Sequence, residues 1–182
     1  MKATGIVRRI DDLGRIVVPK EIRRTLRIRE GDPLEIFTNR GGEIILKKYS
    51  PIGELSTFAK EYADALAQVS GHIVVITDRD QVISVSGGAK KEMVGKNISK
   101  DLEELINERE TLNTAKGKDK AIPVTEDATS CPEGEIIYPI ISEGDIIGAV
   151  VIIGKEGKAG ISETEHKLAG VAAAFLGRQM EG

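Results

Sequence analysis

The sequence predicts an α+β protein with two domains. Three observations support this prediction: charge is divided unequally along the chain, strand-like and helix-like patterns alternate, and Ser50-Pro51 separates two stretches of different composition. With 182 residues, 40% of them hydrophobic, the chain is long enough to bury at least one ordinary core. Because proline disfavours the continuation of a strand, we expect a first domain at residues 1–50, a linker into a helix at 51–55 and a second domain at 56–182.

The net charge of -3 is the sum of two domains of opposite sign. Residues 1–50 contain 12 Lys and Arg against 7 Asp and Glu, a net charge of +5, whereas residues 51–182 contain 14 against 22, a net charge of -8. A basic module beside an acidic one is typical of a nucleic-acid-binding protein with a solvated partner domain.

The first domain is expected to consist of short elements. We predict strands at 4–10 and 15–18 around a turn at 11–14, a short helix opened by Pro19, and a hairpin of strands at 33–37 and 43–46 with a turn at Gly41-Gly42. About fifty residues of this kind bury too little apolar surface to fold alone, and no disulfide or metal cluster is available to help. The first domain is therefore expected to dimerise.

The second domain begins with a predicted helix that ends at Gly71. Strands at 72–77 and 82–86, a helix at 99–109 and a hairpin of strands at 135–141 and 146–153 follow. The apolar stripe of the first helix has spacings of three and four residues: Ile52, Leu55, Ala59, Tyr62, Leu66 and Val69.

The last predicted helix begins at Ser162 and runs to about Met180. Ser162 and Glu165 form the Ser-x-x-Glu pattern of a capping box. Small residues spaced four apart offer a close approach to another helix: Gly170 with Ala174, and Ala173 with Gly177. Two interpretations stay open: the first and last helices form a second association surface, or both cover their own sheet.

Basic residues in the first domain form the clearest candidate site. Lys20, Arg23, Arg24 and Arg27 have the i, i+3, i+4, i+7 spacing of one helix face. If Ile10 pairs with Arg15 across the turn, Arg8 lies opposite Val17 and shares a face with Arg15. A twofold dimer would double these groups into a surface that meets phosphates and base edges with planar guanidinium donors.

The order of residues in this segment closely resembles the AbrB-like swapped-hairpin DNA-binding domain. The resemblance covers residues 1 to about 49 and implies a barrel-like dimer of interleaved hairpins, in which Arg8, Arg15, Arg23 and Arg24 contact double-stranded DNA. Arg9, Lys20 and Arg27 are added as candidates from the basic stripe and the charge. Recognition by DNA shape rather than a strict base code is the expectation for this family. The matching segments are Thr4-Gly5-Ile6-Val7-Arg8, Asp12-Leu13-Gly14-Arg15-Ile16-Val17-Val18-Pro19, Glu21-Ile22-Arg23-Arg24-Thr25-Leu26 and Leu34-Glu35-Ile36.

The second domain resembles a GAF domain by its layout, an antiparallel sheet with flanking helices. Together, the two halves resemble sporulation transcription regulators of endospore-forming bacteria. This resemblance implies activation and repression of late sporulation genes, a homodimer through the first domain and a homotetramer through the C-terminal helices. No cofactor is expected. The second domain either senses a small metabolite, in a pocket between the sheet and Lys120 to Glu135, or is a scaffold without a ligand.

Other functions have weaker support. Cys131, His72 and His166 have no neighbours at metal-ligand or catalytic spacing, so we expect no metal site and no enzymatic activity. Apolar runs such as Ala149 to Ile153 are far shorter than the roughly 20 residues of a membrane helix, and a cytoplasmic, nucleoid-associated protein is expected. A promoter-binding antitoxin is the alternative function, although strand and helix signals across 52–180 differ from a disordered toxin-binding tail.

Overall fold

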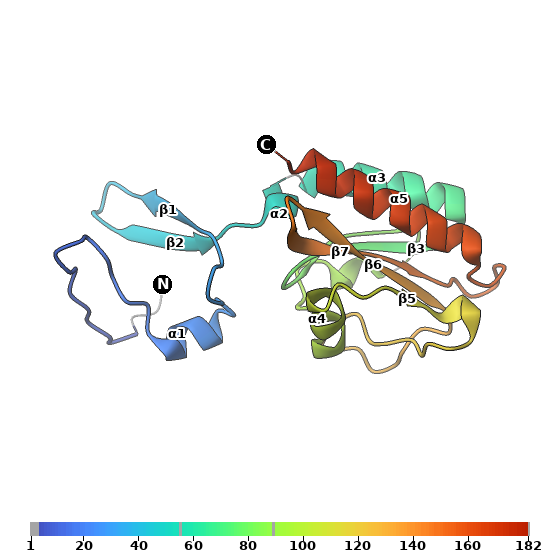
Figure 1. The fold of residues 1–182 in the computed structure, drawn as a ribbon, viewed down its shortest axis with the longest axis horizontal. Coiled ribbons are helices and arrows are strands. Elements are labelled where there is room, and N and C mark those ends of the chain that lie inside the picture. The colour runs from blue at the N-terminus through green and yellow to red at the C-terminus, as the bar shows by residue number, and fades with distance from the viewer. Residues whose placement is uncertain (1–3, 55, 89, 182) are drawn as a thin grey trace. The chain divides into compact units, whose positions relative to one another are not determined.

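The chain forms two compact units, Met1–Tyr49 and Ser50–Gly182, which we call the N-terminal and C-terminal units. The computed structural model describes residues 4–54, 56–88 and 90–181 (Figure 1). Leu55, which belongs to the predicted apolar stripe of the first long helix, lies outside the described residues.

The N-terminal unit contains helix α1 (Lys20–Thr25) and strands β1 (Leu34–Thr38) and β2 (Ile44–Lys48). The two strands form an antiparallel hairpin in a register that runs from Leu34 opposite Lys48 to Thr38 opposite Ile44. The second predicted hairpin is therefore present. Asn39 closes its turn, because its side-chain oxygen accepts hydrogen bonds from the backbone N–H groups of Gly41 and Glu43, each at 3.0 Å.

The first predicted hairpin forms only its turn. Asp11 N donates to Arg15 O at 3.0 Å and Gly14 N to Asp11 O at 3.0 Å, but residues 4–10 and 15–18 form no ladder. The assumed pairing of Ile10 with Arg15 was therefore wrong for the single chain. A ribbon of two strands needs a packed face for stability, and the arms have none here: Val7 is 84% exposed and Val17 is 73% exposed.

The N-terminal unit has almost no core of its own. Among residues 4–49, Pro19 is the only buried residue. Twelve large apolar or aromatic side chains of this range are exposed, and each represents roughly 1.5–3 kcal/mol of stabilisation that burial would supply. They are Ile6, Val7, Ile10, Leu13, Ile16, Val17, Leu26, Ile36, Phe37, Ile44, Leu46 and Tyr49.

The C-terminal unit is built on a five-stranded antiparallel sheet in the order β4-β3-β7-β6-β5. The strands are β3 (Ile73–Asp78), β4 (Val82–Ser86), β5 (Leu112–Asn113), β6 (Glu135–Ser142) and β7 (Asp145–Ile153). The predicted strands are confirmed to within one residue at each end, and the short β5 was not predicted. The central strands are buried on both faces, which explains their rich content of β-branched residues.

Helices cover both faces of this sheet (Figure 1). Helices α3 (Ser56–Ser70) and α5 (Glu163–Gln179) pack with α2 (Pro51–Glu54) on one face, in a core that includes Ile76, Ile136 and Leu176. Helix α4 (Lys100–Asn107) and the loops around it pack on the other face, in a core that includes Val75, Val151 and Leu102. Short 3₁₀ turns lie at Lys90–Met93 and Thr114–Lys116.

Two predictions for the first helices need correction. Residues 51–54, expected as a linker, form α2, and Ile52 is fully buried in the core of the C-terminal unit. Ser50 starts this helix, since its hydroxyl accepts from Gly53 N at 3.0 Å and donates to Asp78 at 2.9 Å. The predicted stripe along α3 was also wrong at its end, because Val69 is 73% exposed while the small Ala63 and Ala67 face the sheet.

Candidate nucleic-acid interface

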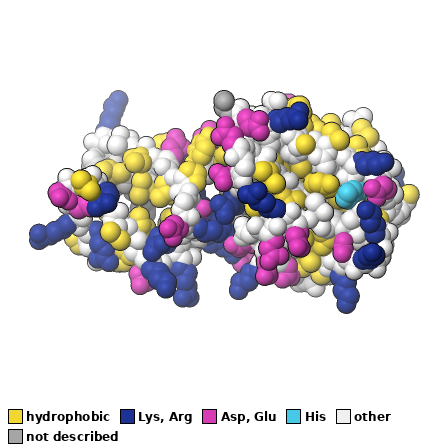
Figure 2. Space-filling model, viewed as in Figure 1, with side chains coloured by type: hydrophobic (Ala, Val, Ile, Leu, Met, Phe, Trp, Pro, Cys, Tyr) yellow, Lys and Arg dark blue, Asp and Glu magenta, His cyan; other side chains and the backbone are white. Residues whose placement is uncertain are grey.

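The predicted DNA-binding residues are almost all exposed on the N-terminal unit. Arg8, Arg9, Arg15, Lys20, Arg23 and Arg24 are exposed, and Arg27 is half-buried. Figure 2 shows Lys and Arg side chains on this unit beside uncovered hydrophobic side chains. In the part of the chain that the structure describes, no acidic side chain pairs with Arg8, Arg9, Arg23 or Arg24. These cations are available to an external anion.

Helix α1 positions three of the predicted residues together. Lys20, Arg23 and Arg24 lie at i, i+3 and i+4, and all three are exposed on this helix of six residues. Pro19 is the residue before the helix rather than its first residue, and Ile22 is half-buried on the opposite side. The basic stripe is therefore confirmed for these three side chains.

Arg27 does not continue the stripe, because the helix ends at Thr25. The N–H of Ile28 bonds to Arg23 O at 2.8 Å and the N–H of Arg27 to Arg24 O at 3.3 Å, which is the bond pattern of a Schellman motif. Arg27 occupies the left-handed position of this motif with φ 52°. Its carbonyl accepts a hydrogen bond from Lys48 Nζ at 2.7 Å, so the helix end is fixed to β2.

Arg15 differs from the other arginines because the turn before it binds its side chain. Arg15 Nε lies 2.8 Å from Asp11 Oδ2. The other carboxylate oxygen of Asp11 accepts the backbone N–H groups of Arg15 at 2.8 Å and Leu13 at 3.0 Å. These hydrogen bonds, first of all the one from the Arg15 backbone, hold the pKa of Asp11 below its ordinary value of 3.8. From the sequence, Asp11 was expected in the turn, with no contact to a DNA-binding residue.

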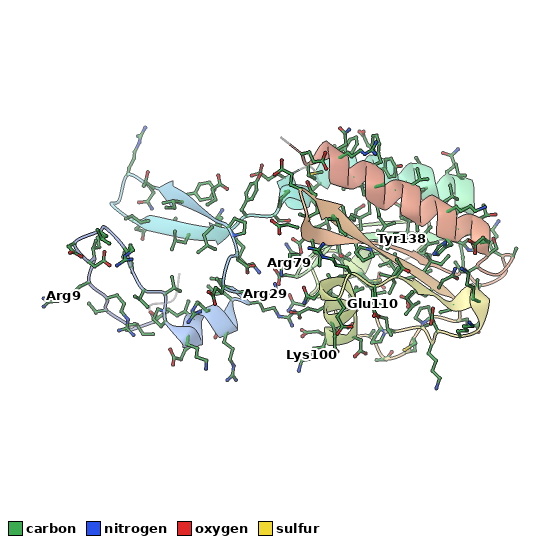
Figure 3. All side chains as sticks on the ribbon, in the orientation of Figure 1. Arg9, Arg29, Arg79, Lys100, Glu110 and Tyr138 are labelled. Atoms are coloured by element: carbon green, nitrogen blue, oxygen red, sulfur yellow. The ribbon has the colours of Figure 1, made fainter. Side chains whose placement is uncertain are left out.

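Arg8 and Arg9 lie on the extended segment before this turn. Arg8 makes a local hydrogen bond to Val7 O at 3.1 Å, and Figure 3 shows Arg9 pointing away from the rest of its segment. The predicted face shared by Arg8 and Arg15 depends on strand pairing that the single chain does not form. The structure therefore brings together the α1 residues but does not bring Arg8 to Arg15.

The space between the sheet and residues 120–135, where a ligand pocket was one of two expectations, is occupied by packed side chains in the part of the chain that the structure describes. The sheet face under α4 is filled by fourteen buried apolar side chains, among them Ile98, Ile106 and Ile137. The segment before β6 is tied to the sheet by Glu135, whose side chain is fully buried and accepts a hydrogen bond from Ile122 N at 2.9 Å. A cleft lies elsewhere, lined by Gly95, Lys96, Asn97, Glu126 and Asp127. Lys96 and Asp127 are already paired there at 2.8 Å.

The outer surface of α3 and α5 carries an aromatic cluster, formed by Phe58, Tyr62 and Phe175. The rings of Tyr62 and Phe175 stack with centroids 5.2 Å apart, and Phe58 lies 6.0 Å from Phe175. Val69 and Val171 on the same two helices are 73% and 64% exposed. We call these five residues the outer helical patch.

One glycine from each of the two predicted small-residue pairs, Gly170 and Gly177, packs against the unit's own sheet. A side chain at Gly177 would meet the Ile141 carbonyl at 2.1 Å, and one at Gly170 would meet the Tyr138 ring at 3.2 Å. Figure 3 shows Tyr138 beneath α5. Ala173 is buried and Ala174 is exposed. The close approach that these residues permit is therefore between α5 and β6.

The remaining polar candidates have structural surroundings. His72 is buried, and its Nδ1 accepts a hydrogen bond from Lys155 N at 3.3 Å, while His166 lies 3.6 Å from Glu163. Cys131 is an exposed free cysteine. Within the described residues no group of His, Cys, Asp and Glu side chains is arranged to hold a metal ion. None of the helices described is both long and apolar enough to cross a membrane.

Comparisons with known proteins cover both units. Residues 54–181 match the family described as "Stage V sporulation protein T C-terminal, transcription factor", and residues 7–54 match "Antidote-toxin recognition MazE, bacterial antitoxin". The chain is 58% identical to Stage V sporulation protein T of Bacillus subtilis, over all of this chain and 99% of that protein. It is 45% identical to the transition state regulatory protein AbrB of Bacillus subtilis, over 46% of this chain and 88% of that protein.

Among solved structures, the C-terminal unit resembles the GAF domain of the Acinetobacter phosphoenolpyruvate-protein phosphotransferase. The TM-score is 0.54 at 14% identity, with 74% of this chain and 84% of that chain covered. This likeness shows the fold alone. It confirms the predicted GAF-like antiparallel sheet with flanking helices.

Proposed function

Because the chain belongs to the stage V sporulation protein T family of transcription factors, we propose that it regulates late sporulation genes by binding double-stranded DNA through its N-terminal unit. It acts as an activator at some promoters and as a repressor at others, without enzymatic activity. The residues that contact DNA are Arg8, Arg15, Arg23 and Arg24. Arg9 and Lys20 add positive charge at the edge of this DNA-binding surface.

One observation carries this proposal: exposed, unpaired cations and exposed apolar side chains occur on the same unit. Arg23 and Arg24 have no acidic partner among the described residues, so phosphate binding does not require an internal ion pair to break. The twelve exposed apolar side chains need a second surface to cover them. A second copy of the same unit supplies that surface and doubles the cations.

We assign the dimer to interleaving of the two N-terminal hairpins. Residues 4–10 and 15–18 have strand-forming composition but no ladder in the single chain. Pairing with the same segments of a second copy satisfies their backbone groups and buries Val7, Val17 and Ile36 together. This arrangement also gives Arg8 and Arg15 the common face that the sequence analysis assumed.

The C-terminal unit serves a second association between dimers. The outer helical patch presents Phe58, Tyr62, Phe175, Val69 and Val171 on α3 and α5, and a second copy of this patch is its occupant. The interior beneath α4 is packed with apolar side chains, which favours a scaffold over a sensor with a preformed pocket.

Footprinting on genomic fragments tests the DNA-binding assignment. The full-length protein is compared with the Arg8→Ala, Arg15→Ala, Arg23→Ala and Arg24→Ala variants, and each substitution is expected to weaken protection at the bound promoters. Lys158→Ala, a change of an exposed cation in the C-terminal unit, is the control and leaves the footprint unchanged. If all four arginine variants protect the promoters as the wild-type protein does, these arginines do not bind the DNA.

A second candidate is an antitoxin, because residues 7–54 match an antitoxin family. The match ends at residue 54, the last residue of α2, and the rest of the chain forms a folded unit with two cores on the faces of a five-stranded sheet. A toxin-binding tail is usually disordered before it binds. Copurification of a small stable protein in a fixed ratio with the chain would favour the antitoxin.

A further inference from the structure

Asp11 is an acidic residue in the turn between Arg8 and Arg15, two residues proposed to bind DNA. Its carboxylate is in contact with Arg15 at two points, the side-chain Nε at 2.8 Å and the backbone N–H at 2.8 Å. Asp12, the next residue, is also acidic and exposed but makes no side-chain hydrogen bond or ion pair in the described structure. The two neighbours therefore carry the same charge in different settings.

A carboxylate beside DNA phosphates is repulsive, so removing it should strengthen binding if charge were its only effect. The contact between Asp11 and Arg15 uses Nε of the guanidinium. An arginine binds guanine or phosphate with two parallel N–H groups, and the terminal nitrogens of Arg15 can supply both. An Nε contact thus limits the rotation of the guanidinium without occupying the donors that face a ligand.

We propose that Asp11 is a positioning residue for DNA recognition: it holds the guanidinium of Arg15 in the orientation in which its terminal nitrogens meet DNA. This inference rests on the proposed DNA contact of Arg15. Arg15 is exposed along 70% of its side chain, so without Asp11 it samples many rotamers that binding must then restrict. The same carboxylate closes the turn through Leu13 N and Arg15 N, which keeps the base of the side chain in place.

The test compares Asp11→Asn with Asp12→Asn in the full-length protein, by DNA affinity at fixed salt. Both substitutions remove one negative charge, and the Asn side chain keeps the oxygen that accepts the backbone N–H groups of the turn. Asp12→Asn is expected to raise affinity by up to about threefold through reduced repulsion. Asp11→Asn is expected to lower it by about threefold to tenfold, which corresponds to one side chain that must be ordered on binding.

A double-mutant cycle separates positioning from a structural role. In the Arg15→Ala background, Asp11→Asn has no guanidinium to orient and is expected to behave like Asp12→Asn. If Asp11→Asn lowers affinity equally with and without Arg15, the residue only maintains the turn and the proposal is overturned. Equal effects of Asp11→Asn and Asp12→Asn in the wild-type background also overturn it.

Comparison of Arg15→Ala with Asp11→Asn separates the DNA contact of Arg15 from the positioning role of Asp11. If Arg15→Ala loses affinity while Asp11→Asn raises it, the DNA contact of Arg15 stands and only the positioning role fails. If Arg15→Ala retains full affinity, the DNA contact itself is wrong, and the role of Asp11 fails with it.

Discussion

Arg27 occupies a backbone position at which glycine is the usual residue. Its φ of 52° lies in the left-handed region, where a Cβ atom costs about 1 kcal/mol relative to glycine. Arg27→Gly and Arg27→Ala both remove the half-buried side chain, so their difference isolates the backbone. We expect the glycine variant to be about 1 kcal/mol more stable than the alanine variant in urea unfolding of the full-length protein. Equal stabilities would show that the helix end readily takes another conformation.

Gly177 lies so close to the backbone of β6 that no side chain fits at this position. A Cβ at this position would lie 2.1 Å from the Ile141 carbonyl oxygen, so α5 must move away from β6 to accept any side chain. Gly177→Ala is therefore expected to lower the free energy of unfolding by about 2–3 kcal/mol, as overpacking against backbone does. Gly170→Ala is the control, since its contact at 3.2 Å is with the Tyr138 ring, which can shift. Thermal unfolding of the two variants measures the difference, and a smaller loss at Gly177 than at Gly170 would contradict it.

Properties of single residues could be predicted from the sequence where they depend only on near neighbours in the chain. Exposure of Arg23 and Arg24 follows from helix spacing, and both are exposed. Two features were missed: the contact of Asp11 with the Arg15 side chain and the left-handed backbone of Arg27. Each depends on a hydrogen bond that forms only when the turn or the helix end has formed. The pattern of an Asp four residues before an Arg, in a turn with glycine between them, was the available signal for the first.

The beginning of α5 is stabilised by the capping box that the sequence predicted. The Ser162 side chain accepts the N–H of Thr164 at 3.2 Å, and Glu165 accepts the N–H of Ser162 at 2.9 Å. Ser162→Ala is expected to cost about 1 kcal/mol of stability, whereas Thr164→Ala, an exposed position one residue into the first turn, should have a small effect. Chemical unfolding of both variants near neutral pH tests this, and equal losses would mean that the cap contributes nothing.

The same cap gives the C-terminal unit a defined pH dependence. Burial raises the pKa of Glu165, but hydrogen bonds from the Ser162 hydroxyl and from the backbone of Glu165 and Ser162, with a smaller contribution from His72, together outweigh burial and hold this pKa below its ordinary value of 4.5. The stabilisation is therefore complete above pH 4.5 and is lost as the pH falls through the lowered pKa. The wild-type protein should be more stable than Glu165→Gln at pH 7, and the gap should narrow below pH 4.5. A constant gap from pH 7 to pH 3 would contradict this linkage.

Elements of the C-terminal unit were predictable because their patterns are satisfied within one chain. Strands β3 and β7 bury both faces, and their β-branched runs show it directly in the sequence. Residues 4–10 and 15–18 have the same strand preference, yet no ladder forms, since propensity alone does not stabilise a ribbon without a covered face. The two-residue β5 was too short to leave any periodicity.

The two units differ in how much buried core each forms without a second chain. The C-terminal unit has a core on both sheet faces, whereas Pro19 is the only buried residue in 4–49. Val17→Asp is therefore expected to prevent the N-terminal dimer and abolish DNA binding while the C-terminal unit stays folded. Near-native circular dichroism of the sheet, together with loss of the gel shift, is the expected result. Retained DNA binding by this variant would contradict a dimer built on the exposed apolar side chains. Ser130→Asp, which makes the same charge change at an exposed loop position of the C-terminal unit, is the control.

The salt dependence of DNA affinity shows how many N-terminal dimers of one oligomer bind the DNA at the same time. The proposed N-terminal dimer would carry eight arginines, Arg8, Arg15, Arg23 and Arg24 from each chain, and if half of them neutralise phosphates, the slope of log affinity against log salt is roughly -4. The proposed tetramer, held by the outer helical patch, would place two such dimers on one DNA and double the slope to roughly -8 on a fragment with two sites. Phe175→Asp, which puts a charge into the outer helical patch, should return the slope to roughly -4 without changing affinity for a single site.

Fluorescence anisotropy from 50 to 200 mM KCl measures the slope on fragments with one site and with two sites. Glu181→Gln, a change at an exposed position outside the patch, is the control. A slope near -4 on both fragments for the wild-type protein would mean that the dimer is the binding unit, because a second reading surface cannot engage DNA without releasing further counterions.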